Sequence, residues 1–529
     1  MKAMKDVALS AKNIVRRFKE SKAKRYQWES HWRDCYDYAL PQRGVFNDAT
    51  VGGGRRTGHL YDGTACDAVE QLAASMMAHM TPSWSRWFGL IEGRYRRRHF
   101  ESSVADMLED TSATLQSHFD RSNFAMAMHQ CYLDLVTAGT ACLMFEQKAL
   151  GGSSSFHFTC VPLSDVVCEE SAEGHLDVTL RRRLVDVRAL RRRYPTLVLP
   201  PKAHQQERAD GSWRVSVIDM VSPRDKGDGY DYVAVFEDLE GGQGGVIEHA
   251  LFYESPFINF RWLKAPGEVY GRSPVMKALP DIKTANKVVE LILKNASIAV
   301  TGIWQAEDDG VLNPSNIRLV PGMIIPKAVG SRGLTPLEAP GRFDVSQLVL
   351  KDLRERIRQA LIVDRLGPPQ QSKMTATEVL ERSADLSRLL GATYGRLQNE
   401  LMAPLIKRGL GILRRMGVIE EVRIDGHVVD VEYHAPLARA QRRADAHNVM
   451  VWLDAVSALG GDAMAGVDMA GIMRWLGEKL GVPRDLLETR AHALAHVAQD
   501  VVHMALSADA MADKNHGGDH GGDHRRDEE

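Results

Sequence analysis

The stretch PVMKALPDIKTANKVVELILKNAS, residues 274–297, decides the fold of this chain. Pro274 stands in its first turn, where a missing N–H leaves no hydrogen bond unmade. Apolar residues recur at helical spacing through Val275, Ile282 and Val289, and they fall in one broad sector when residues are placed about 100° apart. The spacing predicts a long amphipathic helix.

Three lysines lie on nearly the opposite side of this helix. Lys283, Lys287 and Lys294 fall within about 40° of one another around the helix axis. On the residues alone, a face exposed to solvent is the commoner explanation of such a stripe. A contact with DNA phosphates is the alternative, but 67 basic against 69 acidic residues give a net charge of only −2. Because phosphate binding depends on basic residues, any DNA contact must be weak and local.

A Gly/Pro-rich module follows at about 299–343, and then a second helix at 344–366, which Gly367-Pro368-Pro369 ends. Residues 367–374 are a short polar loop. Thr375-Ala-Thr-Glu378 has the pattern of a capping box and opens a helix of about 40 residues, in which Pro404 predicts a kink. A strand-like piece at 422–433 precedes helical sequence at 438–508. We expect the His/Gly/Asp-rich tail, residues 511–529, to be disordered.

The part before residue 274 alternates between helix and strand. Helical spacing ends at Pro41 and returns at 64–80, 104–119 and 124–136, whereas short β-rich runs separated by Gly and Pro occupy 141–262. The whole chain is therefore predicted to be α+β and predominantly helical.

No stretch of the sequence predicts catalysis. The glycine spacing of Gly53 to Gly58 is that of a phosphate-binding P-loop, but His59 stands where that loop needs lysine and Leu60 where it needs Ser or Thr. The six cysteines form no C-x-x-C pair, so we expect buried free thiols rather than a metal site. We expect no cofactor. No run reaches the roughly 18 uncharged apolar residues of a membrane span, so no membrane partner is expected.

Six short segments resemble, in order, the head-to-tail connector (portal) proteins of T7-like and related podoviruses. They are Tyr36-Asp-Tyr-Ala-Leu-Pro-Gln-Arg43, Leu60-Tyr-Asp-Gly-Thr-Ala65, Thr81-Pro-Ser-Trp-Ser-Arg-Trp-Phe88, Val269-Tyr-Gly-Arg-Ser-Pro274, Met374-Thr-Ala-Thr-Glu-Val379 with Arg382, and Glu432-Tyr-His-Ala-Pro-Leu-Ala-Arg-Ala-Gln441. Each segment is short, but the ordered set is specific.

The resemblance implies a portal fold that assembles as a cyclic, dodecameric ring around DNA. The parts it implies are a wing (1–273), two stem helices (274–298 and 344–366) flanking a clip (299–343), a channel loop (367–374), a long wing helix and strand (375–436), a helical crown (437–510) and the tail (511–529). Such a ring conducts DNA into the capsid during packaging and out during ejection, and it is not an enzyme.

The same resemblance gives the stripe a function. Channel-lining residues are then expected to be Lys283, Lys287, Lys294, Gln370, Gln371 and Lys373. The expected partners are other copies of the chain, double-stranded DNA bound transiently, the large terminase subunit, the tail adaptor and tail proteins, and the major capsid and scaffolding proteins. The expected location is the unique vertex of the virion, after assembly in the host cytoplasm. Another virion structural protein and a DNA-processing enzyme remain the alternatives.

Overall fold

The computed structural model describes residues 2–44, 56–92, 102–148, 154–195, 214–237, 245–301, 343–363, 393–419, 429–433, 448–456 and 468–480, apart from 84 and 225–226. It also describes 304–306, 329–330 and 334–336 and the single residues 46, 54, 197, 391, 446 and 458. The chain divides into two compact units, Met1–Pro436 and Leu437–Glu529. The predictions for 367–374, 375–378 and 511–529 lie outside the described residues.

Helices fill the first part of the chain where the spacing predicts them. They are α1 (Lys2–Ala39), η1 (Pro41–Arg43), α2 (Thr64–Met80), α3 (Ser102–Asp120) and α4 (Phe124–Ala138). The predicted bounds of α2 are confirmed, and Leu72 and Met76 lie on its buried side. Gly139 ends α4 at a φ of 77°, a left-handed conformation that favours glycine.

Two antiparallel sheets carry most of the strands. The three-stranded sheet has the order β3 (Phe156–Val161), β2 (Thr140–Gln147), β9 (Phe257–Arg261). The five-stranded sheet has the order β4 (Val166–Glu169), β5 (Val178–Asp186), β6 (Arg214–Pro223), β7 (Tyr230–Phe236), β8 (Val246–Phe252), with the short helix α5 (Val187–Arg193) after β5. A separate pair joins β1 (Phe88–Glu92) to β12 (Val429–Tyr433).

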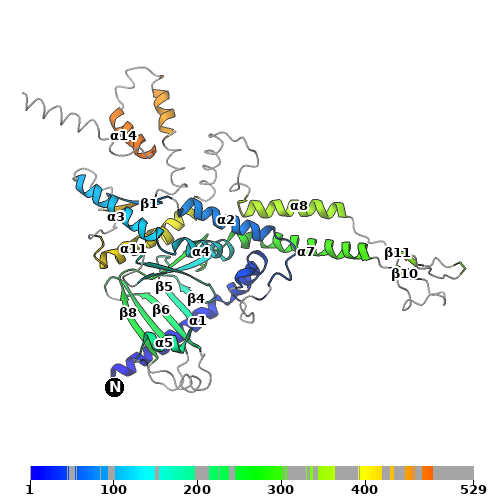
Figure 1. The fold of residues 1–529 in the computed structure, drawn as a ribbon, viewed down its shortest axis with the longest axis horizontal. Helices are drawn as coiled ribbons and strands as arrows, with labels where there is room; N and C mark the ends of the chain where they lie inside the picture. Colours follow the sequence, from blue (N-terminus) through cyan, green and yellow to red (C-terminus); the bar gives the residue numbers. More distant parts are fainter. Residues whose placement is uncertain are drawn as a thin grey trace, which may run out of the picture. The chain divides into compact units, whose positions relative to one another are not determined.

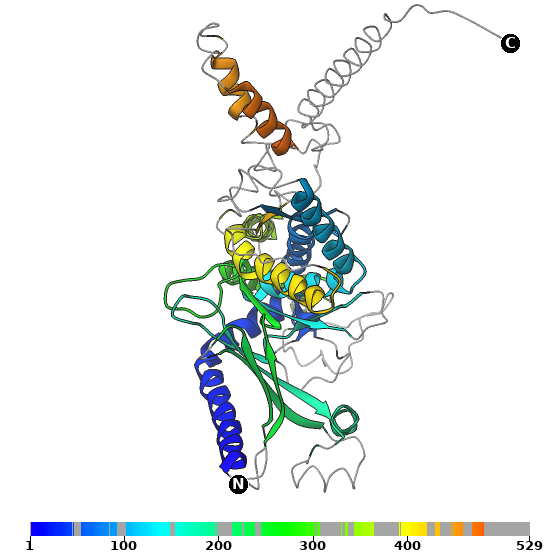
Figure 2. The ribbon, with the colours of Figure 1, turned by 90° about the vertical axis from the view of Figure 1, so that its left-hand side faces the viewer.

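Helix α1 covers one face of the five-stranded sheet (Figure 2). Ala11, Ile14, Val15 and Phe18 of the helix form one buried cluster with Val167, Leu180, Ile218 and Val235 of the strands. Successive side chains of a strand point to opposite faces, so one residue in two along each strand meets the helix. Burial of this apolar surface holds the helix on the sheet.

Aromatic rings fill the space between α3, α4 and the three-stranded sheet. The ring centroids of Phe145 and Phe158 are 4.3 Å apart, and those of Phe119 and Phe124 are 5.0 Å apart. Large buried rings contribute both area and edge-to-face contacts. This cluster is a second core within the first unit.

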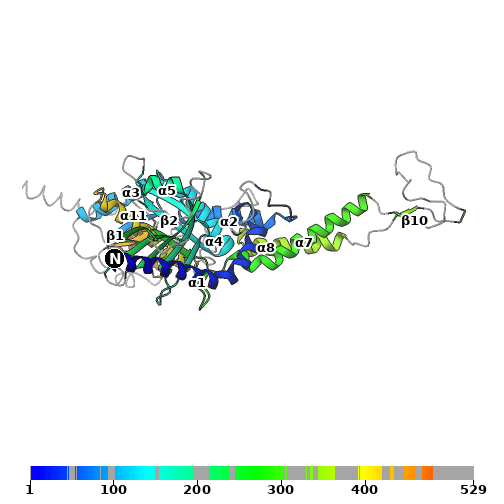
Figure 3. The same ribbon diagram turned by 90° about the horizontal axis from the view of Figure 1, so that it is seen from below.

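Helices α7 (Pro274–Thr301) and α8 (Phe343–Ala360) lie side by side (Figures 1 and 3). Leu350, Leu353 and Ile357 make the buried stripe of α8. After α7, β10 (Trp304–Ala306) pairs antiparallel with β11 (Leu334–Pro336). The second helix does not run unbroken through the predicted range: α8 ends at Ala360, and Ile362 follows at a φ of 61°, which a right-handed helix cannot contain. The predicted end at 366 lies outside the described residues.

The kink predicted at Pro404 takes the form of a change of helix type. A π-helical turn, η3 (Gln398–Met402), precedes α11 (Ala403–Arg415). Pro404 has no N–H to donate to the carbonyl four residues earlier. In the turn just before it, the N–H of Ala403 donates to the carbonyl of Gln398, five residues back, which is the hydrogen bond of a π-helix. The turn sets Glu400 against the buried Arg261, whose guanidinium donates to it at 2.7 Å.

The second unit is helical where it is described. Residues 448–456 are helix, and so is α14 (Met469–Leu480), which agrees with the helical sequence predicted for this region. Within the described part of the chain, no helix is both long enough and apolar enough to cross a lipid bilayer.

Candidate functional site

The α7–α8 pair is attached to the loop before α2 through one asparagine. The Asn286 side-chain oxygen accepts from the backbone N–H of Tyr61 at 2.7 Å and of Asp62 at 3.1 Å, and its nitrogen donates to the His59 carbonyl at 2.9 Å. Asn286 is buried. Since one side chain satisfies three backbone groups, it fixes the position of α7 against this loop.

Asp62 attaches the second helix of the pair to the same loop. Its carboxylate accepts from the Arg354 guanidinium of α8 at 2.8 Å and from the Thr64 N–H at 2.9 Å. Burial alone would raise the pKa of Asp62, but the hydrogen bonds from Thr64 and Arg354 outweigh it and hold this pKa below its ordinary value. The carboxylate therefore stays ionised and keeps its guanidinium partner.

Lys283, the first of the predicted channel residues, is bound within its own subunit. Its ammonium lies 2.7 Å from a carboxylate oxygen of Asp34 in α1 and 5.5 Å from the centre of the Tyr38 ring. The lysine side chain is 40% exposed, so it closes the α1–α7 contact and still meets solvent on one side.

Lys287 and Lys294 share a single carboxylate. The Lys287 ammonium lies 2.9 Å from one oxygen of Glu290, and the Lys294 ammonium lies 2.6 Å from the other. Both lysine side chains are 62% exposed. These two residues carry the exposed positive charge of the predicted stripe, and Glu290 partly neutralises it.

The exposed side of α7 also includes a lysine that the sequence reasoning missed. Exposed residues follow one another at three- and four-residue steps along α7, in a row that drifts roughly 100° around the axis: Lys277, Pro280, Thr284, Lys287, Leu291 and Lys294. At about 100° per residue, Lys277 lies roughly 80° around the axis from Lys287, so helical spacing alone does not place it in the stripe. The structure thus leaves Lys277, Lys287 and Lys294 exposed, whereas Lys283 pairs with Asp34 of α1.

The remaining predicted channel residues, Gln370, Gln371 and Lys373, lie outside the described residues. They stay a prediction.

Large apolar side chains are exposed on the helix pair. Leu291 and Leu293 of α7 are 49% and 52% exposed, and Leu348 of α8 is 72% exposed. Isolated exposed leucines are common on monomers, but several on two neighbouring helices are typical of a surface that another chain covers.

The arginine runs of the sequence make ion pairs within the subunit. Arg182 pairs with Glu237 at 2.9 Å, and Arg183 pairs with the buried Asp219 at 2.8 Å. Arg191 to Arg193 form the last turn of α5, where positive charge suits the negative end of the helix dipole. The runs on β5 and α5 therefore have a structural explanation.

No set of catalytic groups converges among the described residues. They include no group of three or more His, Cys, Asp or Glu side chains that could hold a metal ion. The imidazole of His59 bonds to the Asp37 carbonyl at 3.0 Å. All six cysteines are free thiols, and all but the half-buried Cys66 are buried, as predicted.

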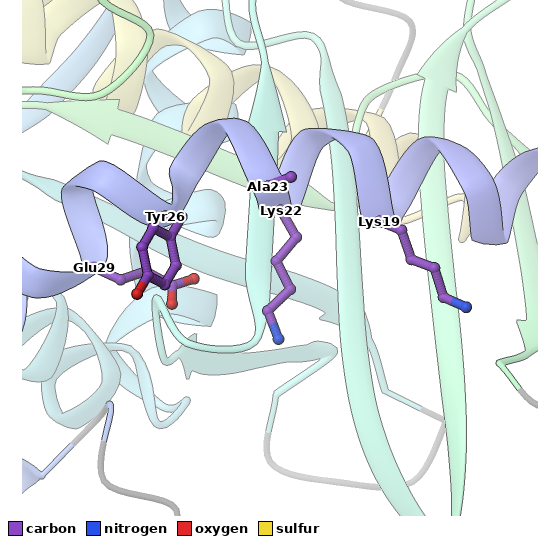
Figure 4. A pocket seen from close by; sticks show the side chains of 5 residues that line it. All are labelled: Lys19, Lys22, Ala23, Tyr26 and Glu29. Carbon is purple, nitrogen blue, oxygen red and sulfur yellow. The ribbon is translucent and has the colours of Figure 1, made fainter.

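A shallow hollow of about 430 Å³ lies on the outer side of α1 (Figure 4). Lys19, Lys22, Ala23, Tyr26 and Glu29 line it, and all of them come from this one helix. A catalytic pocket holds groups that converge from separate elements. The hollow is therefore part of a solvated helix face.

The family model for the bacteriophage head to tail connecting protein matches residues 11–487 of the chain. The probable portal protein of Bordetella phage BPP-1 is 25% identical over 500 residues, which cover 90% of this chain and 88% of that protein. The portal protein of Salmonella phage epsilon15 is 24% identical over 453 residues, covering 81% and 79%. The portal protein of Escherichia phage T7 is 21% identical over 411 residues, covering 75% and 73%.

Proposed function

Because the chain belongs to the family of bacteriophage head to tail connecting proteins and functions as a phage portal protein, we propose that its subunits form a closed, dodecameric ring around a channel for double-stranded DNA. The protein is part of the head–tail connection of the virion. DNA passes through it into the head during packaging and out during ejection. This role is structural and needs no catalytic residue in the chain.

The observation that carries the proposal is the extent of the family match, residues 11–487. That range includes both sheets, the α7–α8 pair and α14. A match to one small module could be shared among proteins of different function, whereas this one covers nearly all of the chain.

The α7–α8 pair supports the ring. Cyclic rings are built from contacts between two different surfaces of neighbouring subunits. Leu293 of α7 and Leu348 of α8 are exposed outside the row that contains Lys287 and Lys294, and they supply apolar surface for such contacts. In this proposal α7 and α8 are the stem, residues 299–343 are the clip, the α/β part before residue 274 is the wing, and the helices of the second unit are the crown.

The exposed lysines of α7 are proposed to line the channel. Lys287 and Lys294 are each 62% exposed and so can reach a ligand, and Lys277 is a further exposed lysine of the same helix. Lys283 contributes less, because Asp34 already holds its ammonium. A sparse, partly neutralised stripe suits a conduit, since each phosphate held tightly adds a barrier to sliding.

The proposed partners follow from this arrangement. Packaging needs an ATPase, and the glycine-rich segment of this chain lacks the lysine of a P-loop, so a separate terminase subunit would dock on the clip. The tail adaptor would replace it when packaging ends. Capsid and scaffolding proteins would contact the wing. Assembly would take place in the host cytoplasm before the ring joins the virion.

Electron microscopy of the purified protein tests the ring. We expect rings with a central hole that is wide enough for a DNA duplex to pass freely. Monomers that cleave DNA in the presence of a metal ion would overturn the proposal.

The channel assignment is tested by charge. The double variant K287Q/K294Q should bind duplex DNA more weakly than the native ring. A plot of the logarithm of its DNA-binding constant against the logarithm of salt concentration should also be less steep. The slope should decrease by about 0.9 for each phosphate that is no longer neutralised. The matched control is K19Q/K22Q on the exposed side of α1, which removes the same charge away from α7. Equal effects of the two double variants would contradict the assignment.

A further inference from the structure

Glu290 occupies an unusual position among the exposed lysines of α7. Its two carboxylate oxygens are each bound to a different lysine, one turn before it and one turn after it, at 2.9 Å from Lys287 and 2.6 Å from Lys294. The Glu290 side chain is 16% exposed, whereas each lysine is 62% exposed. The carboxylate is thus less exposed than either of the two ammonium-bearing side chains that it joins.

The carboxylate is held in its charged form. Hydrogen bonds from Lys294 and then Lys287 lower the pKa of Glu290, and the hydrogen bond to Glu290 raises the pKa of Lys294. Glu290 and Lys294 are therefore both ionised at neutral pH. Two positive charges and one negative charge share two turns of the helix, so this group of three residues carries a net charge of +1 instead of +2.

This arrangement weakens the contact with a phosphate without removing it. An ammonium group has three N–H donors, and Glu290 takes one from each lysine. The others remain available to a phosphate. The phosphate must nevertheless approach a carboxylate a few ångströms away, and its attraction to the two lysines is reduced by that repulsion.

We propose that Glu290 limits the strength with which the portal channel holds DNA, so that Lys287 and Lys294 guide the duplex without retaining it. This inference rests on the proposed function, namely that the exposed side of α7 faces the channel. Cyclic assembly would repeat the effect once in every subunit, so a small change in each contact becomes a large change in the release barrier of the ring.

The test compares native rings with the variant E290Q in binding to duplex DNA over a range of salt concentrations. Glutamine keeps the shape and the hydrogen-bonding oxygen but removes the charge. We expect E290Q to bind DNA more tightly, with a log K that falls more steeply with log salt, by about 0.9 for each further phosphate neutralised. Ring size is checked by microscopy, so that a failure of assembly is not mistaken for weaker binding.

The matched control is E20Q, which changes an exposed glutamate of α1 whose ion-pair partner, Arg16, lies 3.8 Å away. It alters the net charge of each subunit by the same amount at a position outside α7. We expect E20Q to match the native ring closely. If E290Q does no more than E20Q while K287Q/K294Q still weakens DNA binding, the inference about Glu290 is overturned and the proposed channel stands.

If K287Q/K294Q itself leaves DNA binding unchanged, the channel assignment fails, and the inference fails with it. The triple variant K287Q/E290Q/K294Q separates a third cause. If the triple variant binds DNA more tightly than K287Q/K294Q, the effect of removing the Glu290 charge does not depend on the two lysines, and this would contradict the inference. If the triple variant and K287Q/K294Q bind DNA equally well, while E290Q alone binds more tightly than the native ring, the inference is supported.

Discussion

Replacing Asn286 by alanine should loosen the attachment of α7 to the body of the first unit. In the native protein this side chain is 6% exposed and makes three hydrogen bonds to the backbone of residues 59, 61 and 62. Alanine leaves two N–H groups and one carbonyl without their partner. No neighbouring side chain of α7 bonds to these groups in the described structure.

The expected cost follows from the burial of the three orphaned groups. A buried polar group without a partner costs about 1–3 kcal/mol. The Asp62 N–H bond is buried, whereas the bonds of Tyr61 and His59 are part-buried, so water can reach those two groups. The total is about 2–4 kcal/mol, and the better helix propensity of alanine returns only about 0.5 kcal/mol.

The assay is urea unfolding followed by tryptophan fluorescence, at one protein concentration because assembly stabilises the folded subunit. Hydrogen exchange of the amides of Tyr61 and Asp62 gives a local measure of the same bonds. The control is Asn295→Ala on the same helix, a partly exposed asparagine that should be neutral or slightly stabilising. The reasoning is refuted if the two alanine variants unfold alike and the two amides keep their protection.

Three further results are expected. Arg261→Met should lower the free energy of unfolding by about 3–5 kcal/mol, because it removes the shorter of the two guanidinium contacts of Glu400, leaving Arg396 at 3.4 Å, and also the contact with Glu170. The double variant with Glu400→Gln should cost less than the sum of the two single changes, and an additive result would contradict the pairing. The pKa of Asp62 in the folded protein lies below its ordinary value of 3.8, so its contribution to the free energy of unfolding is present above pH 3.8 and is lost as the pH falls through the folded pKa. The stability difference between the native protein and Asp62→Asn should therefore shrink in acid. A constant difference would count against the ion pair. Alkylation of the native protein near pH 8 should be slow at every thiol and should begin at the half-buried Cys66. Burial, and then the neighbouring carboxylates, raise the pKa of the Cys66 thiol to about 11. Mass spectrometry that found Cys35 modified first would be inconsistent with the packing.

Local sequence was sufficient for most of the helices. The bounds of α2 and the beginning of α7 follow from apolar spacing and from a proline or glycine at the ends. The end of α8 did not follow, because the chain breaks the helix at Ile362, a residue type that rarely adopts a positive φ, and no local sequence signal marks this position.

The lysine stripe was only half predictable. Helical periodicity grouped Lys287 with Lys294, which are both exposed, but it gave no reason to add Lys277, which lies roughly 80° around the axis from Lys287. The position of Glu290 three residues after one lysine and four before the other was readable as well, since residues at these spacings contact each other on any helix. Periodicity could not tell that Lys283 turns toward α1, because Asp34 lies 249 positions away in the chain.

The sequence by itself determined which residues share a face of each helix, the order of helices and strands, and the absence of a P-loop lysine, because each of these depends on neighbours in the chain. The tertiary structure decided which face is covered and by what. Asn286 reaches a loop 225 positions away, Arg354 reaches Asp62 across 292, and Glu400 reaches Arg261 across 139. Such contacts depend on how the elements pack, and the packing fixes which of the lysines on α7 remain free to meet a partner.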